Sequence, residues 1–291
     1  MKNRMEHSTL LRLAEKIQNA DAILIGGGSG LSSAAGYDHY HWSKTLLEAL
    51  APFQEYYGFR SPLDGFYYCY SSYEEQWGYY SQYIRCMWET ATGKPYLDLR
   101  EIVGNKPSFV LTTNVDMQFE RVFVPEQICV YQGSFGYCQC SQPCVDEIRT
   151  NDVLVKELTS HLEGIRLPSE FVPRCKQCGR ILVPWVRDDS FLEGVKWRES
   201  VERYHAFLRH WILERPDSKL LLLELGVGEM TPAIIKLPFW ELTTRNSNVF
   251  YACLNQKKSQ APLHLQGKSL YLQGDLAQTL TELRNLLIKN K

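Results

Sequence analysis

The sequence has no surplus of charge of either sign and no long apolar run. Its 291 residues include 32 Lys and Arg against 33 Asp and Glu, for a formal net charge of −1. Without a basic surplus or long basic runs, the chain offers no footprint for a nucleic-acid backbone, which argues against nucleic acid as its principal partner. The most apolar run, Leu220 to Leu225, is six residues long, whereas a membrane-spanning helix needs about 18. We therefore expect no membrane insertion.

Secretory signals, repeats and low-complexity tracts are missing as well. The N-terminus, Met1 to His7, is polar and lacks the apolar centre of a secretory signal, which predicts a cytoplasmic protein. With 44% hydrophobic residues the chain is neither a disordered tail nor a fibre, and its length fits one large domain with a smaller insert. Its nine cysteines are an odd number and cannot all pair. In a reducing compartment we expect metal ligands or buried small side chains.

Short apolar runs that alternate with helical patterns predict an α/β fold, in which a parallel sheet is covered on both faces. The clearest helical patterns lie at Val195 to Glu214 and Asp275 to Ile288, and Ser8 is predicted to cap a first helix. The strands are predicted at Ala22 to Ile25, Phe109 to Thr113, Ile128 to Tyr131, Leu220 to Leu225, Val249 to Leu254 and Leu270 to Leu272.

Two segments interrupt this alternation and are predicted to be insertions. Residues 37–96 are rich in aromatic side chains between Phe66 and Trp88, which predicts a helical lid with an aromatic core. Residues 136–197 contain five of the nine cysteines and are predicted to form a zinc-binding module. The remaining ranges, 1–36, 97–135 and 198–291, would together form a Rossmann-like domain.

The first predicted strand runs into a glycine turn and then a helix start, the order found in nucleotide sites. Gly28, Ser29 and Gly30 remove bulky side chains where a backbone must approach a pyrophosphate. Ser32 and the N–H groups of the next helix would donate hydrogen bonds to it. A tight turn without any ligand has the same pattern, so this motif alone leaves both interpretations open. The aromatic insertion replaces the second strand and acidic residue of a dehydrogenase, which argues against a hydride carrier.

Four cysteines form two closely spaced pairs. Three residues separate Cys140 from Cys144, and two separate Cys175 from Cys178. Such pairs supply the four sulfur ligands of a tetrahedral zinc ion, which would be structural because no position stays open for water. Cys138 is an alternative ligand at a tight spacing, and buried thiols without metal are the competing interpretation. The other cysteines are predicted to be buried small residues: Cys69, Cys86, Cys129, Cys138 and Cys253.

Polar residues follow two of the predicted strands. Asn114 and Asp116 come directly after the strand that ends at Thr113, and Gln132 follows the strand that ends at Tyr131. Ligands bind at the carboxyl ends of parallel strands, so these three side chains are candidate site residues. Considered alone, Asp116 is better explained as the cap of a helix that follows it.

Taken in chain order, these motifs form one combination: Gly28-Ser29-Gly30-Leu31-Ser32, Ala35-Gly36, Thr113-Asn114-Val115-Asp116, Gln132-Gly133-Ser134-Phe135, the cysteine quartet with Cys178-Gly179, and Pro184. The combination covers nearly the whole chain and resembles the sirtuin (Sir2) family. The aromatic insertion, Val186 to Asp189 and Thr231 to Trp240 are similar to its macrodomain-linked branch, class M. The resemblance implies NAD and a structural Zn²⁺ as cofactors. It places further dinucleotide contacts at Gly36, Gly226, Val227, Gly228, Asn255, Asp275 and Leu276.

Two departures from the family pattern bear on the reaction. Deacylating sirtuins carry His where this chain has Gln132, and their glycine loop ends in Pro-Asp-Phe-Arg, whereas Tyr37-Asp38-His39-Tyr40 stands here. Glutamine cannot titrate, and general-base assistance is typically worth about 10²–10⁴-fold in rate. His39 or His41 could replace the missing base, although an exposed position in the loop is the expected fate of both.

The resemblance therefore implies an NAD-dependent protein ADP-ribosyltransferase that cleaves the nicotinamide–ribose bond. Because the transition state resembles an oxocarbenium ion, Asp116 is the candidate carboxylate near the ribose. Asn114 would orient the substrate, and Gln132 would form hydrogen bonds without titrating. The class M resemblance implies an acceptor similar to the glycine-cleavage H protein, a lipoyl-carrier protein, and a macrodomain hydrolase that reverses the modification. The alternatives are an NAD-dependent deacylase (deacetylase), an NAD glycohydrolase and a non-catalytic NAD-sensing module.

Overall fold

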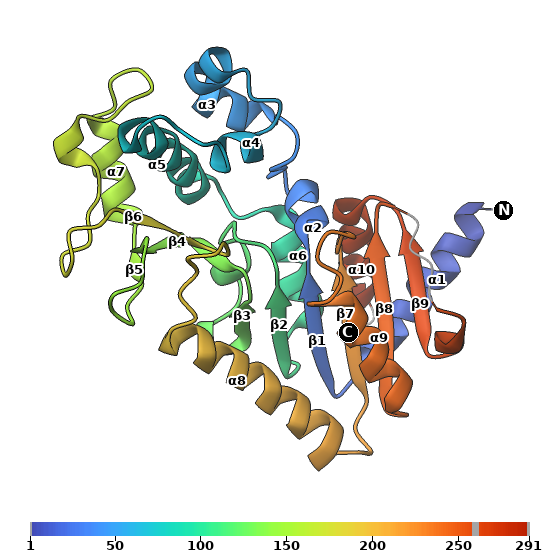
Figure 1. Cartoon of the computed structure of the whole chain (residues 1–291). Helices are drawn as coiled ribbons and strands as arrows, with labels where there is room; N and C mark the ends of the chain where they lie inside the picture. Colours follow the sequence, from blue (N-terminus) through green and yellow to red (C-terminus); the bar gives the residue numbers. More distant parts are fainter. Residues whose placement is uncertain (1, 258–261, 290–291) are drawn as a thin grey trace.

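Six parallel strands form the central sheet, in the order β3-β2-β1-β7-β8-β9 (Figure 1). The computed structural model describes residues 2–257 and 262–289. The strand order reverses between β1 and β7, as in doubly wound nucleotide-binding sheets. The predicted strands are confirmed as β1 Ala22–Gly27, β2 Ser108–Thr112, β3 Ile128–Val130, β7 Leu220–Leu225, β8 Val249–Asn255 and β9 Ser269–Gln273.

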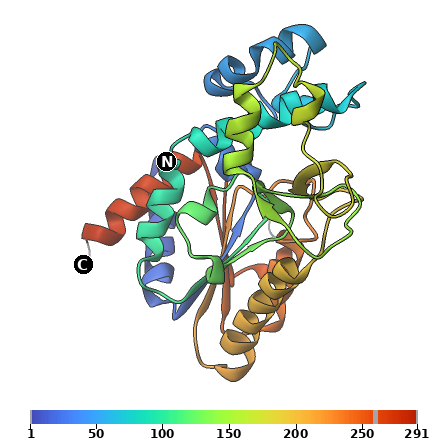
Figure 2. The same cartoon turned by 90° about the vertical axis from the view of Figure 1, so that its left-hand side faces the viewer.

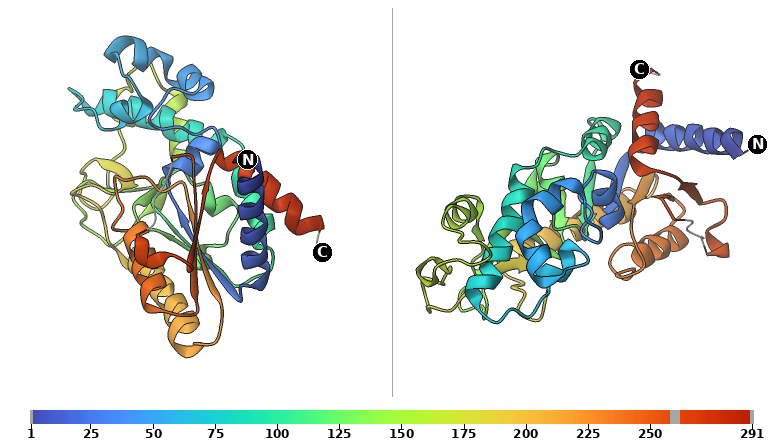
Figure 3. Two further views of the ribbon diagram at one scale, coloured as in Figure 1. Left: turned by 90° about the vertical axis from the view of Figure 1, so that its right-hand side faces the viewer. Right: turned by 90° about the horizontal axis from the view of Figure 1, so that it is seen from above.

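Helices cover both faces of this sheet (Figures 2 and 3). On one face α1 (Lys2–Asn19), α6 (Lys94–Val103) and α10 (Leu276–Lys289) share a hydrophobic core with the strands. On the other face α8 (Val195–Arg209) and α9 (Lys236–Arg245) pack with the strands in a second core. Every residue of β1 and β7 is buried. The predicted layered α/β architecture is therefore confirmed, and the continuous apolar runs follow from burial on both faces.

The first helix begins earlier than the sequence predicts. Helix α1 starts at Lys2, so Ser8 lies inside the helix and the predicted cap is wrong. The segment before Ser8 contains no Pro or Gly to stop the helix. Helix α8 begins at Val195 as predicted, and a π-helical turn, His210–Glu214, continues it.

A smaller unit stands beyond the carboxyl ends of β1, β2 and β3 (Figure 1). It contains a three-stranded sheet in the order β5-β4-β6, formed by β4 Gly133–Cys140, β5 Arg149–Thr150 and β6 Leu182–Val186. Its helices are α3 Lys44–Tyr57, α4 Pro62–Phe66, α5 Tyr73–Glu89 and α7 Asp152–Ser160.

The helical insertion and the cysteine-bearing segment share one hydrophobic cluster. Trp77 and Tyr83 of α5 lie in it together with Phe135 of β4 and Val155 of α7. The predicted aromatic core is thus present, and it extends across both insertions. The predicted domain boundaries stay a prediction, and residues 1, 258–261 and 290–291 of those ranges lie outside the described residues. Within the described ranges, no helix combines the length and apolar character that a bilayer crossing requires.

Candidate active site

Two loops meet where the strand order reverses, one after β1 and one after β7. The Gly30 N–H donates to the Gly226 carbonyl at 2.9 Å, and the Gly28 N–H donates to the Leu225 carbonyl at 3.0 Å. A Cβ on Gly28 would lie 2.6 Å from Val227 Cα, and a Cβ on Gly30 would lie 2.9 Å from Gly226 Cα. Gly226 itself has a φ of +61°. The glycines are therefore required because each loop packs against the backbone of the other.

The helix that follows the first loop, α2 (Ser29–Ala34), has fewer free N–H groups than the sequence suggests. The Leu31 N–H donates to the Gly28 carbonyl at 2.9 Å, and the Gly30 N–H is taken by Gly226. Ser29 is half-buried at the start of the helix, and Gly36 follows its end with a φ of +90°. Fewer backbone donors therefore remain for a phosphate at this turn.

The predicted residues after β7, β8 and β9 lie along the same edge of the sheet. Asn255 Nδ2 donates to the Val227 carbonyl at 2.9 Å, and the Asn255 carbonyl accepts from the Gly274 N–H at 3.0 Å. Asp275 Oδ1 accepts from the Gln278 N–H at 2.7 Å at the start of α10, whose first residue is the buried Leu276. Val227 is buried and Gly228 is exposed. The structure thus joins the ends of β7, β8 and β9 through Val227, Asn255 and Gly274.

A buried tyrosine of α6 brings three predicted site residues together. Tyr96 Oη lies 3.4 Å from Ser32 Oγ, accepts a hydrogen bond from Asn114 Nδ2 at 3.2 Å and donates to Asp116 Oδ2 at 3.4 Å. Asn114 Nδ2 also donates to the Gly28 carbonyl at 3.1 Å. Burial, and next the Asp116 carboxylate, raise the pKa of Tyr96 well above its ordinary value, so the hydroxyl keeps its proton.

Asp116 does not cap an α-helix, so that interpretation of the sequence is wrong. Its Oδ1 accepts from the Gln118 N–H at 3.1 Å, but Met117 has a φ of +63°, which breaks the helical path. Only a 3₁₀ turn follows, Phe119–Arg121. Asp116 is 1% exposed. Its carboxylate is therefore held inside the protein, with Tyr96 on its other oxygen.

Gln132 lies in the turn between β3 and β4. Its carbonyl accepts from the Arg187 N–H at 3.0 Å. Among the described residues, no hydrogen bond joins Gln132 to Asn114 or Asp116. The segment after it does reach their loop, because the Phe135 N–H donates to the Val115 carbonyl at 2.8 Å. Gln132 is thus brought near the Asn114–Asp116 loop through the backbone of β4.

The carboxyl group of a half-buried glutamate supports this turn. Glu120 accepts a hydrogen bond from Ser134 Oγ at 3.0 Å, and Ser134 lies two residues beyond Gln132. Burial, opposed by the Ser134 hydrogen bond and reinforced by the charge of Asp116, raises the pKa of Glu120 to about 7. The sequence analysis did not identify Glu120, since only folding places it against Ser134.

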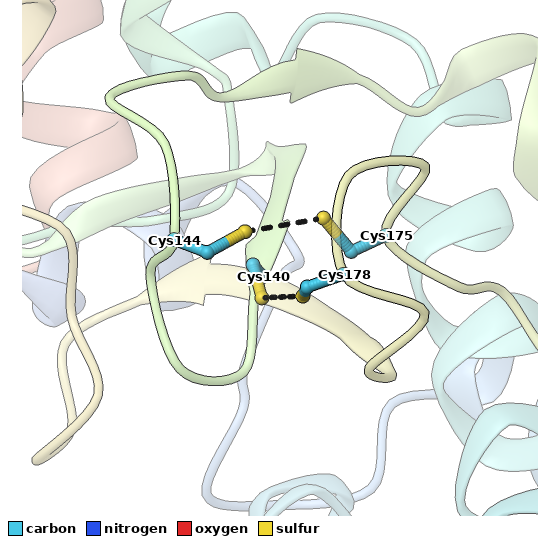
Figure 4. Close-up of side chains that lie close together, drawn as sticks. All are labelled: Cys140, Cys144, Cys175 and Cys178. Carbon is cyan, nitrogen blue, oxygen red and sulfur yellow. Dashed lines mark hydrogen bonds between the residues drawn. The ribbon is translucent and has the colours of Figure 1, made fainter.

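The four predicted metal ligands lie together (Figure 4). Cys140 Sγ is 3.6 Å from Cys178 Sγ, Cys144 Sγ is 3.6 Å from Cys175 Sγ, and all four sulfur atoms lie within 4.8 Å of one another. A tetrahedral zinc ion with bonds of about 2.3 Å sets its sulfur ligands about 3.8 Å apart. The quartet therefore fits a structural zinc ion.

The two cysteine pairs differ in the direction of their thiol pKa shifts. Hydrogen bonds from backbone N–H groups lower the pKa of Cys175, and the one from Arg180 lowers the pKa of Cys178 to about 6. Burial raises the pKa of Cys140, and the neighbouring Cys178 thiol raises the pKa of Cys144 to about 12. The second pair therefore gives up its protons more readily than the first, and metal binding would displace the protons that remain.

The remaining cysteines follow the prediction with one exception. Cys86, Cys129, Cys138 and Cys253 are buried, whereas Cys69 is exposed, so its predicted burial is wrong. Cys69 lies in the turn between α4 and α5, where the neighbouring Tyr67 and Tyr68 also face solvent. Cys138 Sγ accepts from Asn151 Nδ2 at 3.5 Å and belongs to the hydrophobic cluster rather than to the quartet.

Known proteins are similar to this chain in fold and in sequence. A Sir2 homologue solved with NAD gives a TM-score of 0.64 at 14% identity, over 96% of this chain and 94% of that one. A mutant Sir2 homologue solved with ADP-ribose gives 0.65 at 16% identity, over 96% of each chain. A protein ADP-ribosyltransferase of Staphylococcus aureus (strain Mu50) is 30% identical over 290 residues, which are 98% of this chain and 90% of that protein. The chain belongs to the protein ADP-ribosyltransferase family and has the Sir2 (sirtuin) fold.

A second relative of this sirtuin carries an additional activity in its name. A protein of Fusarium oxysporum f. sp. cubense, described as a "Probable bifunctional ADP-ribose hydrolase/ADP-ribosyltransferase", is 31% identical over 241 residues. The match spans 80% of this chain and 40% of that protein. No family model matches the sirtuin.

The two loop histidines of this sirtuin differ in their surroundings. His41 is exposed as predicted, with its Nδ1 3.0 Å from Asp38 Oδ2. His39 is only 8% exposed, so the predicted exposure of this residue is wrong. It packs against Tyr83 of α5 and Phe135 of β4, two elements whose approach the loop sequence does not reveal.

A buried charged cluster under the second glycine loop was also missed. Glu224 of β7 is fully buried, lies 3.3 Å from Lys236 Nζ and accepts from Tyr251 Oη at 2.7 Å. Lys236 also lies 3.3 Å from Glu229, an exposed residue of the loop after Gly228. The one available signal was a charged residue inside the apolar run of β7. Through Lys236, the cluster links Glu229 of the loop to Glu224 of the central sheet.

Proposed function

We propose that this sirtuin transfers ADP-ribose from NAD to a lipoylated carrier protein and releases nicotinamide. The description of its relative as a protein ADP-ribosyltransferase supports ADP-ribose transfer. The Sir2 homologues solved with NAD and ADP-ribose support NAD as the donor. The lipoyl carrier rests on the class M resemblance of the sequence. The observation that carries the proposal is the buried set of Asn114, Asp116 and Tyr96, which hydrogen bonds join after β2. The non-titrating Gln132 stands in the turn before β4.

The proposed donor site follows the two glycine loops and the Tyr96 contacts. Gly28, Gly30 and Gly226 would shape the two loops that receive the pyrophosphate, because they let the loop backbones pack closely, and Ser32 would donate to it. Asn114 would orient the ribose or the amide through its side-chain hydrogen bonds. Asp116, held by Tyr96, would stabilise the positive charge that develops on the ribose as the bond to nicotinamide breaks.

The identity of residue 132 bears on whether the protein catalyses transfer or deacylation. An amide can accept and donate hydrogen bonds, but it cannot remove a proton from a ribose hydroxyl. Deacylation is therefore expected to be weaker by about 10²–10⁴-fold than with a histidine at this position. Transfer to a protein nucleophile does not require that particular proton transfer. Gln132 thus favours the transferase over a deacylase.

The test offers labelled NAD to the sirtuin together with lipoylated and unlipoylated carrier protein. We expect protein-bound ADP-ribose on the lipoylated carrier alone, and its loss in Asp116→Asn. A macrodomain hydrolase is expected to remove the label. Label on neither carrier would refute the proposed acceptor.

The alternatives have their own outcomes in the same assay. Consumption of an acyl-lysine peptide by the unchanged protein would favour the deacylase, whereas activity only after Gln132→His supports the transferase. Nicotinamide release without labelled protein would indicate an NAD glycohydrolase. NAD binding without any turnover, unaffected by Asp116→Asn, would indicate a sensing module.

A further inference from the structure

His39 presents a buried ring nitrogen that has no partner. Its Nδ1 lies 2.5 Å from Tyr83 Oη, so one side of the imidazole is fixed. Its Nε2 is buried and makes no hydrogen bond within residues 2–257 and 262–289. A buried polar atom without a partner is unfavourable and uncommon in folded proteins. The ring is therefore placed to interact with a group that the chain itself does not provide.

The ring lies near the loop that carries Asn114 and Asp116. Its centroid is 6.0 Å from that of Tyr83 and 6.1 Å from that of Phe135, with both rings edge-on. Phe135 is bonded through its N–H to Val115, the residue between Asn114 and Asp116. The His39 carbonyl accepts from the Leu63 N–H at 3.0 Å, which anchors the backbone to α4. The position of the ring is thus fixed from three elements.

The surroundings of His39 allow the ring to be neutral at rest and to accept a proton. Burial lowers the pKa of His39, which keeps the ring neutral near pH 7, while Asp116 and Asp38 act in the opposite direction. The remaining titratable neighbour, Tyr83 of α5, has a pKa raised by burial and stays neutral. When the ring takes up a proton, the two carboxylates would stabilise the resulting imidazolium.

We propose that His39 is the general base of the transfer reaction, with Nε2 as the atom that accepts the proton. This inference rests on the proposed transferase function. The acceptor nucleophile forms a bond to the ribose C1′, the bond from C1′ to nicotinamide breaks, and its electron pair leaves with nicotinamide. The proton lost by the nucleophile passes to Nε2. Asn114 and Gln132 cannot take it, because amides do not titrate in this range.

This role requires one tautomer of the resting ring. Nδ1 must carry the hydrogen and donate it to Tyr83 Oη, so that Nε2 holds the free electron pair. Nitrogen-15 NMR of the unmodified protein reads this tautomer directly, with His41→Gln used to assign the neighbouring signal. We expect a Nδ1–H ring whose Nε2 signal titrates and shifts when NAD is added. A ring with hydrogen on Nε2 would overturn the proposal whether or not any acceptor has been found.

The kinetic test compares His39→Gln with His41→Gln. We expect His39→Gln to lower label transfer by about 10²–10⁴-fold, with a KM for NAD within about threefold of the unchanged protein. The rate of the unchanged protein should rise with pH through the titration of the base, and His39→Gln should lack that rise. The exposed His41→Gln should retain transfer. Restoration of transfer by Gln132→His in the His39→Gln protein would support the loss of a base.

The outcomes separate this inference from the proposed function. Unchanged transfer by a folded His39→Gln protein would overturn the role of His39 and leave the transferase intact. Absence of transfer by the unchanged protein would refute the transferase, while the NMR tautomer would still decide how His39 is arranged. If His39→Gln unfolds at lower temperature, the NMR result on the unchanged protein decides.

Discussion

Replacement of Tyr96 by Phe tests whether one hydroxyl organises the site. The ring stays in the core, but Oη no longer contacts Ser32, Asn114 and Asp116. Asn114 keeps its bond to the Gly28 carbonyl. Asp116 keeps the Gln118 N–H on Oδ1 but loses the donor on Oδ2. The main effect of Tyr96→Phe should therefore be an unsatisfied, buried carboxylate oxygen.

The size of the expected effect follows from the unsatisfied Asp116 oxygen. Leaving a buried acceptor unsatisfied costs about 1–3 kcal/mol in the free energy of unfolding. For a chain of 291 residues this corresponds to a fall in Tm of about 2–5 °C. If the same free energy is lost from the transition state, nicotinamide release should slow about 5- to 150-fold.

Tyr79→Phe is the matched control for this substitution. Tyr79 is also fully buried, and its Oη donates to the Pro62 carbonyl at 2.5 Å, within the aromatic core. We expect a similar fall in Tm, measured by calorimetry, with nicotinamide release unchanged. Equal loss of activity in both variants, or full activity in Tyr96→Phe, would show that Tyr96 does not organise the site.

Three further experiments test other parts of the structure. Gly30→Ala should weaken the rise in Tm that NAD produces, because its Cβ would lie 2.9 Å from the Gly226 backbone; an unchanged rise would contradict the loop packing. Cys178→Ser should remove bound zinc, measured by metal analysis, and lower Tm, whereas Cys138→Ser should retain zinc. The raised pKa of Glu120, about 7 against 4.5, means that its ionisation destabilises the folded chain. Stability should thus decline from pH 4.5 to 7, and Glu120→Gln should flatten that decline in thermal unfolding.

The sequence was sufficient for the features that depend on local pattern. Strands buried on both faces are continuous apolar runs, so β1 and β7 were visible without knowledge of their neighbours. The cysteine pairs were visible for the same reason, since each pair lies within one short loop. Ser8 shows the limit of this approach, because a residue suited to a cap says nothing about whether the preceding residues continue the helix.

The features that the sequence did not reveal depend on contacts between distant segments. Tyr96 meets Ser32 and Asp116 only because the sheet order places α6 beside α2 and the loop after β2. His39 is buried by α5 and β4, neither of which is adjacent to it in the chain. Asp116 makes the short-range bond of a cap, but the φ of Met117 decides that no helix follows.

The contact between the two glycine loops has a consequence for how such sequences can diverge. The space that Gly28 and Gly30 leave empty is filled by the backbone of Gly226 and Val227. A side chain admitted in one loop therefore requires a different path of the other, although the two segments lie at opposite ends of the sequence. Inherited changes in these loops should thus occur in pairs, and a hybrid that combines loops from two divergent relatives should misfit at the switch point.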